Sequence, residues 1–196
     1  MAGSINAGSF DAGPFNAVIL AGGTAARLDG ADKASVELAG RTLLSWALDA
    51  VVDAGEVVVV GDAVPTERPV TFTREDPRHG GPVAALLTGR DALLHERAWL
   101  AVLACDMPHL TTSTFRRLRE AAAGRDGAVL VGPDGRRQLA FVAAVAALDA
   151  VRPDHEAQHG AALQPLLARL DLVEVSSVGA EHRDVDTWAD LRDLSS

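Results

Sequence analysis

Hydrophobic residues occur along the chain in short runs rich in β-branched side chains, and segments with helical spacing separate these runs. This alternation is typical of repeated βαβ units, in which helices cover both faces of a mostly parallel sheet. The pattern therefore predicts an α/β fold with three layers. Strands are expected at Ala17–Leu20, Val57–Val60, Val70–Phe72, Trp99–Ala104, Ala128–Val131, Ala140–Val145 and Leu172–Val175.

Four segments between or after these strands combine helical spacing with residues suited to helix ends. Hydrophobic side chains form one stripe of Thr42–Ala54, and Gly55 suits the left-handed turn that ends many helices. Pro82–Leu94 begins with proline, which fits a first helical turn because its missing N–H has no partner there. The other two helices are expected after a cap at Thr111 or Thr112, with Phe115, Leu118 and Ala122 buried, and over Trp188–Leu194, after Thr187-x-x-Asp190.

The length of 196 residues, with 48% hydrophobic and 23% charged, is enough for one substantial core and lies in the usual range of one domain. We expect residues 1–15 to be a flexible leader, because Gly, Ala, Ser and Asn dominate them, and residues 16–196 to be a single domain. The longest apolar stretch, Leu139–Leu148, is about half of what a membrane-spanning helix requires. The leader lacks the pattern of a secretory signal, so we expect a cytoplasmic protein.

The formal net charge of −9 would repel nucleic-acid phosphates, and no dense run of Lys and Arg offsets it. Nucleic-acid binding is therefore not expected. A polyanionic small substrate would need a few basic side chains and a divalent cation gathered at one point. Cys105 is the one cysteine, and no Cys/His spacing resembles a zinc site, so any metal is expected to have oxygen ligands.

Glycines and basic residues follow the first predicted strand. Gly22 and Gly23 let the backbone approach a ligand and point N–H groups at it, while Arg27 and Lys33 bring positive charge to the same place. The loop matches neither the Walker A pattern nor the dinucleotide glycine fingerprint. Taken alone, the two glycines fit an ordinary turn with solvated basic residues better than a phosphate site.

Carboxylates stand at two further positions where a cation could be held. Asp106 ends the strand Trp99–Ala104 at a carboxyl edge, where it could bind Mg²⁺ together with substrate phosphates or cap the next turn. Near the C-terminus, Asp184 and Asp186 would lie on one side of an extended segment. Helix capping by Asp186 or Thr187 is the commoner explanation for this second pair.

Around these residues the chain resembles a known enzyme family. The run L-A-G-G-x-x-x-R-x-x-G-x-D-K is similar to the signature loop of the nucleoside-triphosphate transferases, and its double glycine resembles the molybdenum cofactor guanylyltransferases. The resemblance implies a Rossmann-like, three-layer fold of the nucleotide-diphospho-sugar-transferase type. It also implies that this loop wraps the triphosphate, through Leu20, Ala21, Gly22, Gly23, Arg27 and Lys33.

The resemblance extends to other segments of the chain. By similarity to the family's C-D-x-P segment, Asp106 would bind Mg²⁺, and Asp76 with Gly81-Pro82 would contact the guanosine part. The stretch from Asp134 to Leu139 resembles the part that faces the acceptor, although Leu139 stands where proline is common. There, Arg136 and Arg137 could neutralise a pterin phosphate or belong to a solvated turn.

The implied reaction is attack of the terminal phosphate of molybdopterin on the α-phosphorus of GTP, with Mg²⁺, Asp106, Lys33 and Arg27 assisting and pyrophosphate leaving. Molybdoenzyme apoproteins or their chaperones would be the protein partners. Two rivals stay open. One is a sibling enzyme that uses CTP with molybdopterin, or a nucleotide with a sugar phosphate. The other is a non-catalytic nucleotide-binding protein, for which Asp29, close to the expected triphosphate, and Leu139 are the only hints.

Overall fold

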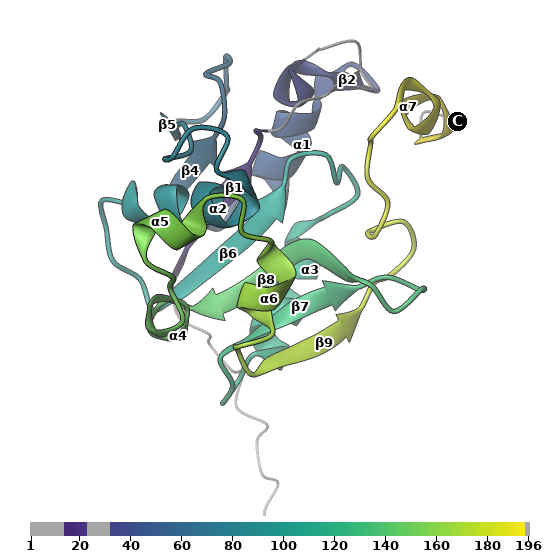
Figure 1. Cartoon of the computed structure of the whole chain (residues 1–196). Coiled ribbons are helices and arrows are strands. Elements are labelled where there is room, and N and C mark those ends of the chain that lie inside the picture. The colour runs from purple at the N-terminus through teal and green to yellow at the C-terminus, as the bar shows by residue number, and fades with distance from the viewer. Residues whose placement is uncertain (1–13, 23–31, 195–196) are drawn as a thin grey trace, which may run out of the picture.

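The computed structural model describes residues 14–22 and 32–194, and within them seven strands form one sheet in the order β5-β4-β1-β6-β8-β7-β9 (Figure 1). All of the strands run parallel except β8, which is antiparallel to both β6 and β7. The mostly parallel α/β class predicted from the sequence is therefore confirmed. The strands are β1 Phe15–Leu20, β4 Val57–Val60, β5 Thr71–Thr73, β6 Trp99–Ala104, β7 Gly127–Val131, β8 Arg137–Ala144 and β9 Leu172–Ser176.

The predicted strands all occur, two of them with the predicted bounds. The largest difference is β8, which begins at Arg137 rather than at Ala140 and runs in reverse. A tight turn causes the reversal: the N–H of Gly132 donates to the carbonyl of Arg136, and Gly135 adopts a φ of 78° that suits glycine. The turn between β7 and β8 consequently lies at the carboxyl edge of the parallel strands.

Helices cover both faces of the sheet. Helices α1 and α3 lie over one face of the sheet, and α2, α4 and α6 lie over the other (Figure 1). Their buried side chains belong to two separate core clusters. The two cores include fully buried residues such as Phe115 and Leu86, and burying a side chain of this size stabilises the fold by about 2 kcal/mol. The helices are α1 Leu43–Ala50, α2 Gly81–Asp91, α3 Thr112–Ala121, α4 Val145–Ala150, α5 His155–Gln158, α6 Leu163–Leu167 and α7 Trp188–Leu194.

Two predicted helix ends are wrong. The helix expected over Pro82–Leu94 ends at Asp91, with Ala92 as its C-cap. The first helix stops at Ala50 rather than Ala54, because Val51 leaves helical geometry with a φ of −117°. Gly55 makes no left-handed turn there. Its N–H instead donates to the carbonyl of Phe15, which joins this loop to the start of β1.

A small third cluster links the region around the first loop to the C-terminal part of the chain. The short helix η2, Lys33–Ser35, leads into a hairpin of β2, Glu37–Leu38, and β3, Arg41–Thr42, none of which was predicted. Val36 and Leu38 pack there against Val185, which is fully buried. Phe15, expected in the leader, is a buried residue of β1. Among the described helices, none is both long enough and apolar enough to cross a membrane.

Candidate functional site

Three charged side chains from distant parts of the sequence meet at the carboxyl edge of β1 and β6. The ammonium nitrogen of Lys33 lies 2.7 Å from Oδ2 of Asp106 and 2.7 Å from Oδ1 of Asp186. The side chains of Lys33 and Asp106 are 16% and 18% exposed, whereas that of Asp186 is 47% exposed. The site is therefore partly buried on the sheet side and open on the side of Asp186.

Hydrogen bonds of Asp106 and of residues next to the three charged residues fix the segments that carry them. The N–H of Cys105 donates to the carbonyl of Leu20, which aligns the end of β6 with the end of β1. Asp32 caps η2 by accepting from the N–H of Ala34, and this turn directs Lys33 toward the sheet. The N–H of Val185 donates to the carbonyl of Asp106 at 2.8 Å. The segments that carry the two carboxylates are therefore joined directly.

Neighbouring charges shift the pKa of Lys33 and the pKa of Asp184 at this site. Burial by itself would lower the pKa of Lys33, but the attraction of Asp106 and hydrogen bonds to both carboxylates outweigh it and raise that pKa. Lys33 is therefore a permanent cation. Asp184 keeps an exposed side chain, yet its pKa is raised by reduced solvation and then by the negative charges of Asp186 and Asp106. This edge of the sheet carries an excess of negative charge that attracts cations.

The residues present fit a divalent cation that shares its coordination with a substrate. Oxygens of Asp106 and Asp186 converge on one position, which the ammonium of Lys33 occupies. No group of three or more His, Cys, Asp or Glu residues in the described part of the chain is arranged to hold a metal alone. Mg²⁺ suits such a place, because it usually takes one or two carboxylates and completes its shell with waters and phosphates.

The capping of α7 is carried by Thr187 and Asp190. Oδ2 of Asp190 accepts from the N–H of Thr187 at 2.7 Å and from that of Asp186 at 3.1 Å, and the Thr187 hydroxyl accepts from the N–H of Asp190. Of the two capping residues that the sequence offered, Thr187 is the one used. The carboxylate of Asp186 is left to pair with Lys33.

The predicted guanosine contacts lie at the same edge of the sheet, after β5 and at the start of α2. The Asp76 carboxylate is 79% exposed and lies 3.7 Å from Nε2 of His155. Gly81 has a φ of 86°, and the carbonyl of Gly80 accepts from the N–H of Gly160. The segment of α5 thus borders the expected base site. Sequence reasoning missed His155, because no local pattern links it to Asp76.

The predicted acceptor stretch lies in the turn between β7 and β8 and in the first residues of β8. Arg137 is paired with Glu174 at 2.9 Å, so its charge is already neutralised. Arg136 is exposed, and none of the described carboxylates forms an ion pair with it. Of the two arginines, Arg136 is the one available to a phosphate group.

Part of the phosphate loop is described and part is not. Leu20 and Ala21 are buried at the end of β1, and Gly22 is exposed directly beyond them. Gly23, Arg27 and Asp29 lie outside the described residues. Cys105 is a buried free thiol whose pKa is raised by burial and by Asp106, as expected for a packing residue.

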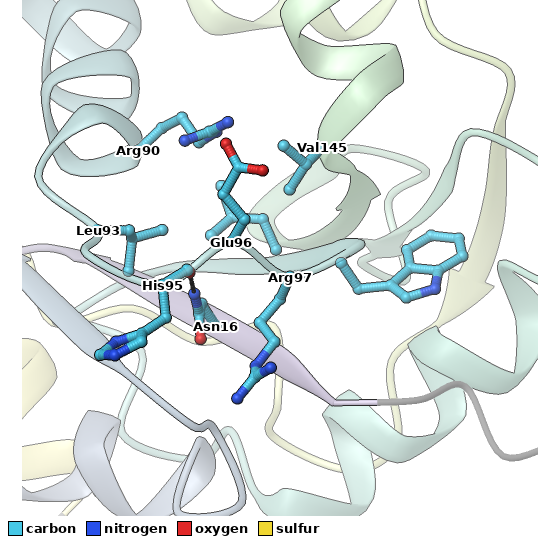
Figure 2. Close-up of a pocket in the computed structure, with 9 residues that line it drawn as sticks. Asn16, Arg90, Leu93, His95, Glu96, Arg97 and Val145 are labelled. Carbon is cyan, nitrogen blue, oxygen red and sulfur yellow. Dashed lines mark hydrogen bonds between the residues drawn. The ribbon is translucent and has the colours of Figure 1, made fainter.

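A small hollow lies at the opposite, amino edge of the sheet. Figure 2 shows Asn16, His95, Glu96 and Arg97 around it, with the side-chain amide of Asn16 donating to the carbonyl of His95. Its volume is about 10 Å³, which is room for about one water molecule. It lies away from the carboxyl edge, where open α/β sheets bind their ligands.

Comparisons with known proteins show the family and the fold of this chain. The family model of the MobA-like NTP transferase domain matches residues 17–175. The molybdenum cofactor guanylyltransferase of Shewanella loihica is 30% identical over 132 residues, which cover 65% of this chain and 66% of that protein. The match thus spans slightly less than two thirds of that relative.

Solved structures show the same fold at lower identity. The 2-C-methyl-D-erythritol 4-phosphate cytidylyltransferase of Thermus thermophilus superposes with a TM-score of 0.72 and 20% identity over 93% of this chain and 97% of its own. The Rv0371c protein of Mycobacterium tuberculosis, solved in complex with manganese, gives a TM-score of 0.66 and 18% identity over 92% of this chain and 97% of its own.

Proposed function

The chain belongs to the MobA-like NTP transferase family, and we propose that it transfers a guanylyl group from GTP to the terminal phosphate of molybdopterin in the cytoplasm, releasing pyrophosphate. The observation that carries this proposal is the meeting of Lys33, Asp106 and Asp186 at the sheet edge where β1 leads into Gly22. The name of the Shewanella relative, molybdenum cofactor guanylyltransferase, supports a guanylyl group as the group transferred and the molybdenum cofactor as its acceptor.

The residues of the site suit positioning and charge neutralisation rather than covalent catalysis. A phosphate monoester has a second pKa near ~6, so the acceptor is already largely dianionic at neutral pH and needs little help from a base. Lys33 is a permanent cation at the place where the triphosphate would lie, and it would donate hydrogen bonds to phosphate oxygens. Arg136 would neutralise the acceptor phosphate.

Asp106 and Asp186 would hold Mg²⁺ between them and the triphosphate. The ion would supply a positive charge for the leaving pyrophosphate. Asp76 and the start of α2 would contact the guanosine. Gly81 has a positive φ that suits glycine, and the lack of a side chain there would let the backbone approach that ligand.

A nucleotide panel tests the proposal. Thermal melts with Mg²⁺ and each of GTP, CTP, ATP and UTP should show the largest increase in melting temperature with GTP, because a ligand selective for the native state stabilises it by mass action. Adding molybdopterin to the GTP sample should release pyrophosphate. A larger shift with CTP would favour the sibling cytidylyltransferase. A shift with GTP but no pyrophosphate would favour a non-catalytic nucleotide-binding protein.

A further inference from the structure

A buried carboxylate lies outside the site described above. Glu181 is only 7% exposed, and its side chain accepts three hydrogen bonds. The Thr114 hydroxyl donates to Oε1 at 2.5 Å, while the Arg117 guanidinium at 2.6 Å and the backbone N–H of Val178 at 2.7 Å both donate to Oε2. A buried charge is costly unless it is paired in this way, so the contacts define one position for this side chain.

These contacts join the segment that carries Asp186 to α3, the helix that follows Asp106. Residues 177–187, which we call the crossing segment, lead from β9 at the edge of the sheet to α7, and no helix or strand forms within them (Figure 1). Thr114 and Arg117 belong to α3, where Thr114 is also part of the capping box with Thr111. Since α3 begins shortly after Asp106, Glu181 ties the crossing segment to the first helix that follows that residue.

A second contact holds the crossing segment at its other end. The N–H of Val185 donates to the carbonyl of Asp106, and the Val185 side chain is fully buried against the hairpin of β2 and β3. Asp186 comes next and reaches Lys33. The path of the chain into Asp186 is therefore set by Glu181 on one side and Val185 on the other.

We propose that Glu181 is a positioning residue that holds the crossing segment so that the Asp186 carboxylate converges with that of Asp106. This inference rests on the proposed function, in which both carboxylates bind a divalent cation. The fold itself does not require Glu181, because α3 is held on the sheet by apolar residues such as Phe115 and Leu118. The loss of Glu181 should consequently act on the cation site more than on the core.

Three variants separate positioning from general stability. Glu181→Ala removes all three contacts. Glu181→Gln can keep them, because its carbonyl can accept from Arg117 and Val178 while its amide donates to the Thr114 hydroxyl, which also accepts. Glu56→Ala is the matched control: the Glu56 carboxylate accepts from the N–H groups of Leu94 and His95, and its side chain is 14% exposed. It lies near the amino edge of the sheet, away from the cation site.

The first readout is the affinity for Mn²⁺ without nucleotide, measured from the electron paramagnetic resonance signal of the free ion. Glu181→Ala should weaken binding by about 10- to 100-fold, as outer partners of metal ligands commonly do. Glu181→Gln and Glu56→Ala should stay near the wild type. The second readout is amide hydrogen exchange, which should accelerate in residues 182–190 for Glu181→Ala only.

Other outcomes would overturn the inference. Glu181→Ala with wild-type Mn²⁺ affinity and unchanged exchange in residues 182–190 would show that Glu181 does not position Asp186. Arg117→Met, which removes one donor only, serves if Glu181→Ala does not fold, and it should shift both readouts in the same direction. A wild-type protein that binds Mn²⁺ but releases no pyrophosphate from GTP and molybdopterin would refute the proposed function. The Mn²⁺ affinities and the hydrogen exchange of the variants would still decide whether Glu181 positions Asp186.

Discussion

The ammonium of Lys33 lies 2.7 Å from the carboxylate of Asp106, although the two residues are 73 positions apart in the sequence. The same nitrogen bonds Asp186, which is 153 positions away. Lys33 therefore occupies the place between two carboxylates that a divalent cation would share. In the proposed function these partners would be exchanged: Asp106 and Asp186 would hold Mg²⁺, and Lys33 would donate to phosphate oxygens of the nucleotide.

Replacing the Asp106 carboxylate should affect turnover far more than stability. Asp106→Asn keeps an oxygen that can accept from Lys33 but loses the charge, so pyrophosphate release should fall roughly a hundredfold or more. The melt should stay cooperative, with a change of at most about 5 °C. Asp171→Asn is the control, since it removes an exposed carboxylate paired with Arg125. Near-normal turnover in Asp106→Asn would refute a catalytic role for Asp106.

Removing the ammonium of Lys33 should have opposite effects on metal binding and turnover. In Lys33→Met, no internal cation competes for the two carboxylates, so nucleotide-free Mn²⁺ should bind at least about threefold more tightly. Pyrophosphate release should fall roughly a hundredfold, because the triphosphate loses its lysine. Arg125→Met removes the same charge from an exposed ion pair and should change neither. Weaker Mn²⁺ binding in Lys33→Met would contradict the exchange of partners.

The turn before α2 should be sensitive to one added methyl group. A Cβ at Gly80 would lie 2.6 Å from the Cβ of Ala84 and 2.6 Å from the carbonyl oxygen of Pro77, so this turn must shift. We expect Gly80→Ala to raise the KM for GTP, measured from pyrophosphate release. Gly55→Ala, where a Cβ would make only ordinary contacts of 3.5 Å or more, is the control. An unchanged KM would argue against a nucleotide contact at this turn.

Glu56 should make stability depend on pH in the acid range. Burial by itself raises the pKa of its carboxyl, but hydrogen bonds from Leu94 and His95 outweigh it and place that pKa below its ordinary value. The stabilisation is therefore present above the unfolded pKa of about 4.3 and is lost as the pH falls through the folded pKa. At pH 7, Glu56→Gln should lower the free energy of unfolding by about 1 kcal/mol and should therefore melt at a lower temperature than the wild type. The difference in stability between the wild type and Glu56→Gln should become smaller as the pH falls. A difference that stays constant with pH would exclude this pH dependence from Glu56.

Local patterns along the chain were sufficient for the fold class and for the existence of the strands in the seven-stranded sheet. Val57–Val60 and Trp99–Ala104 form strands with the predicted bounds. Runs of β-branched and apolar residues favour buried strands, and such a run can be recognised without knowing the rest of the fold. Asp106 could be selected because a polar residue directly after a buried strand lies at the carboxyl edge, wherever the other strands lie. The roles of Arg27, Asp76 and the other chosen residues stay proposals.

Tertiary contacts decided the rest. The reversed direction of β8, the choice of Thr187 as the cap and the pairing of Asp186 with Lys33 all depend on groups that meet only in the folded chain. The burial of Glu181 against α3 is of the same kind, since a glutamate in a polar stretch has no local sign of its partners. The spacing of hydrophobic residues indicates which side chains are buried. Ion pairs, in contrast, depend on which distant segments the fold brings together. The sequence by itself therefore indicated where chemistry is expected, and the fold determined which charges share it.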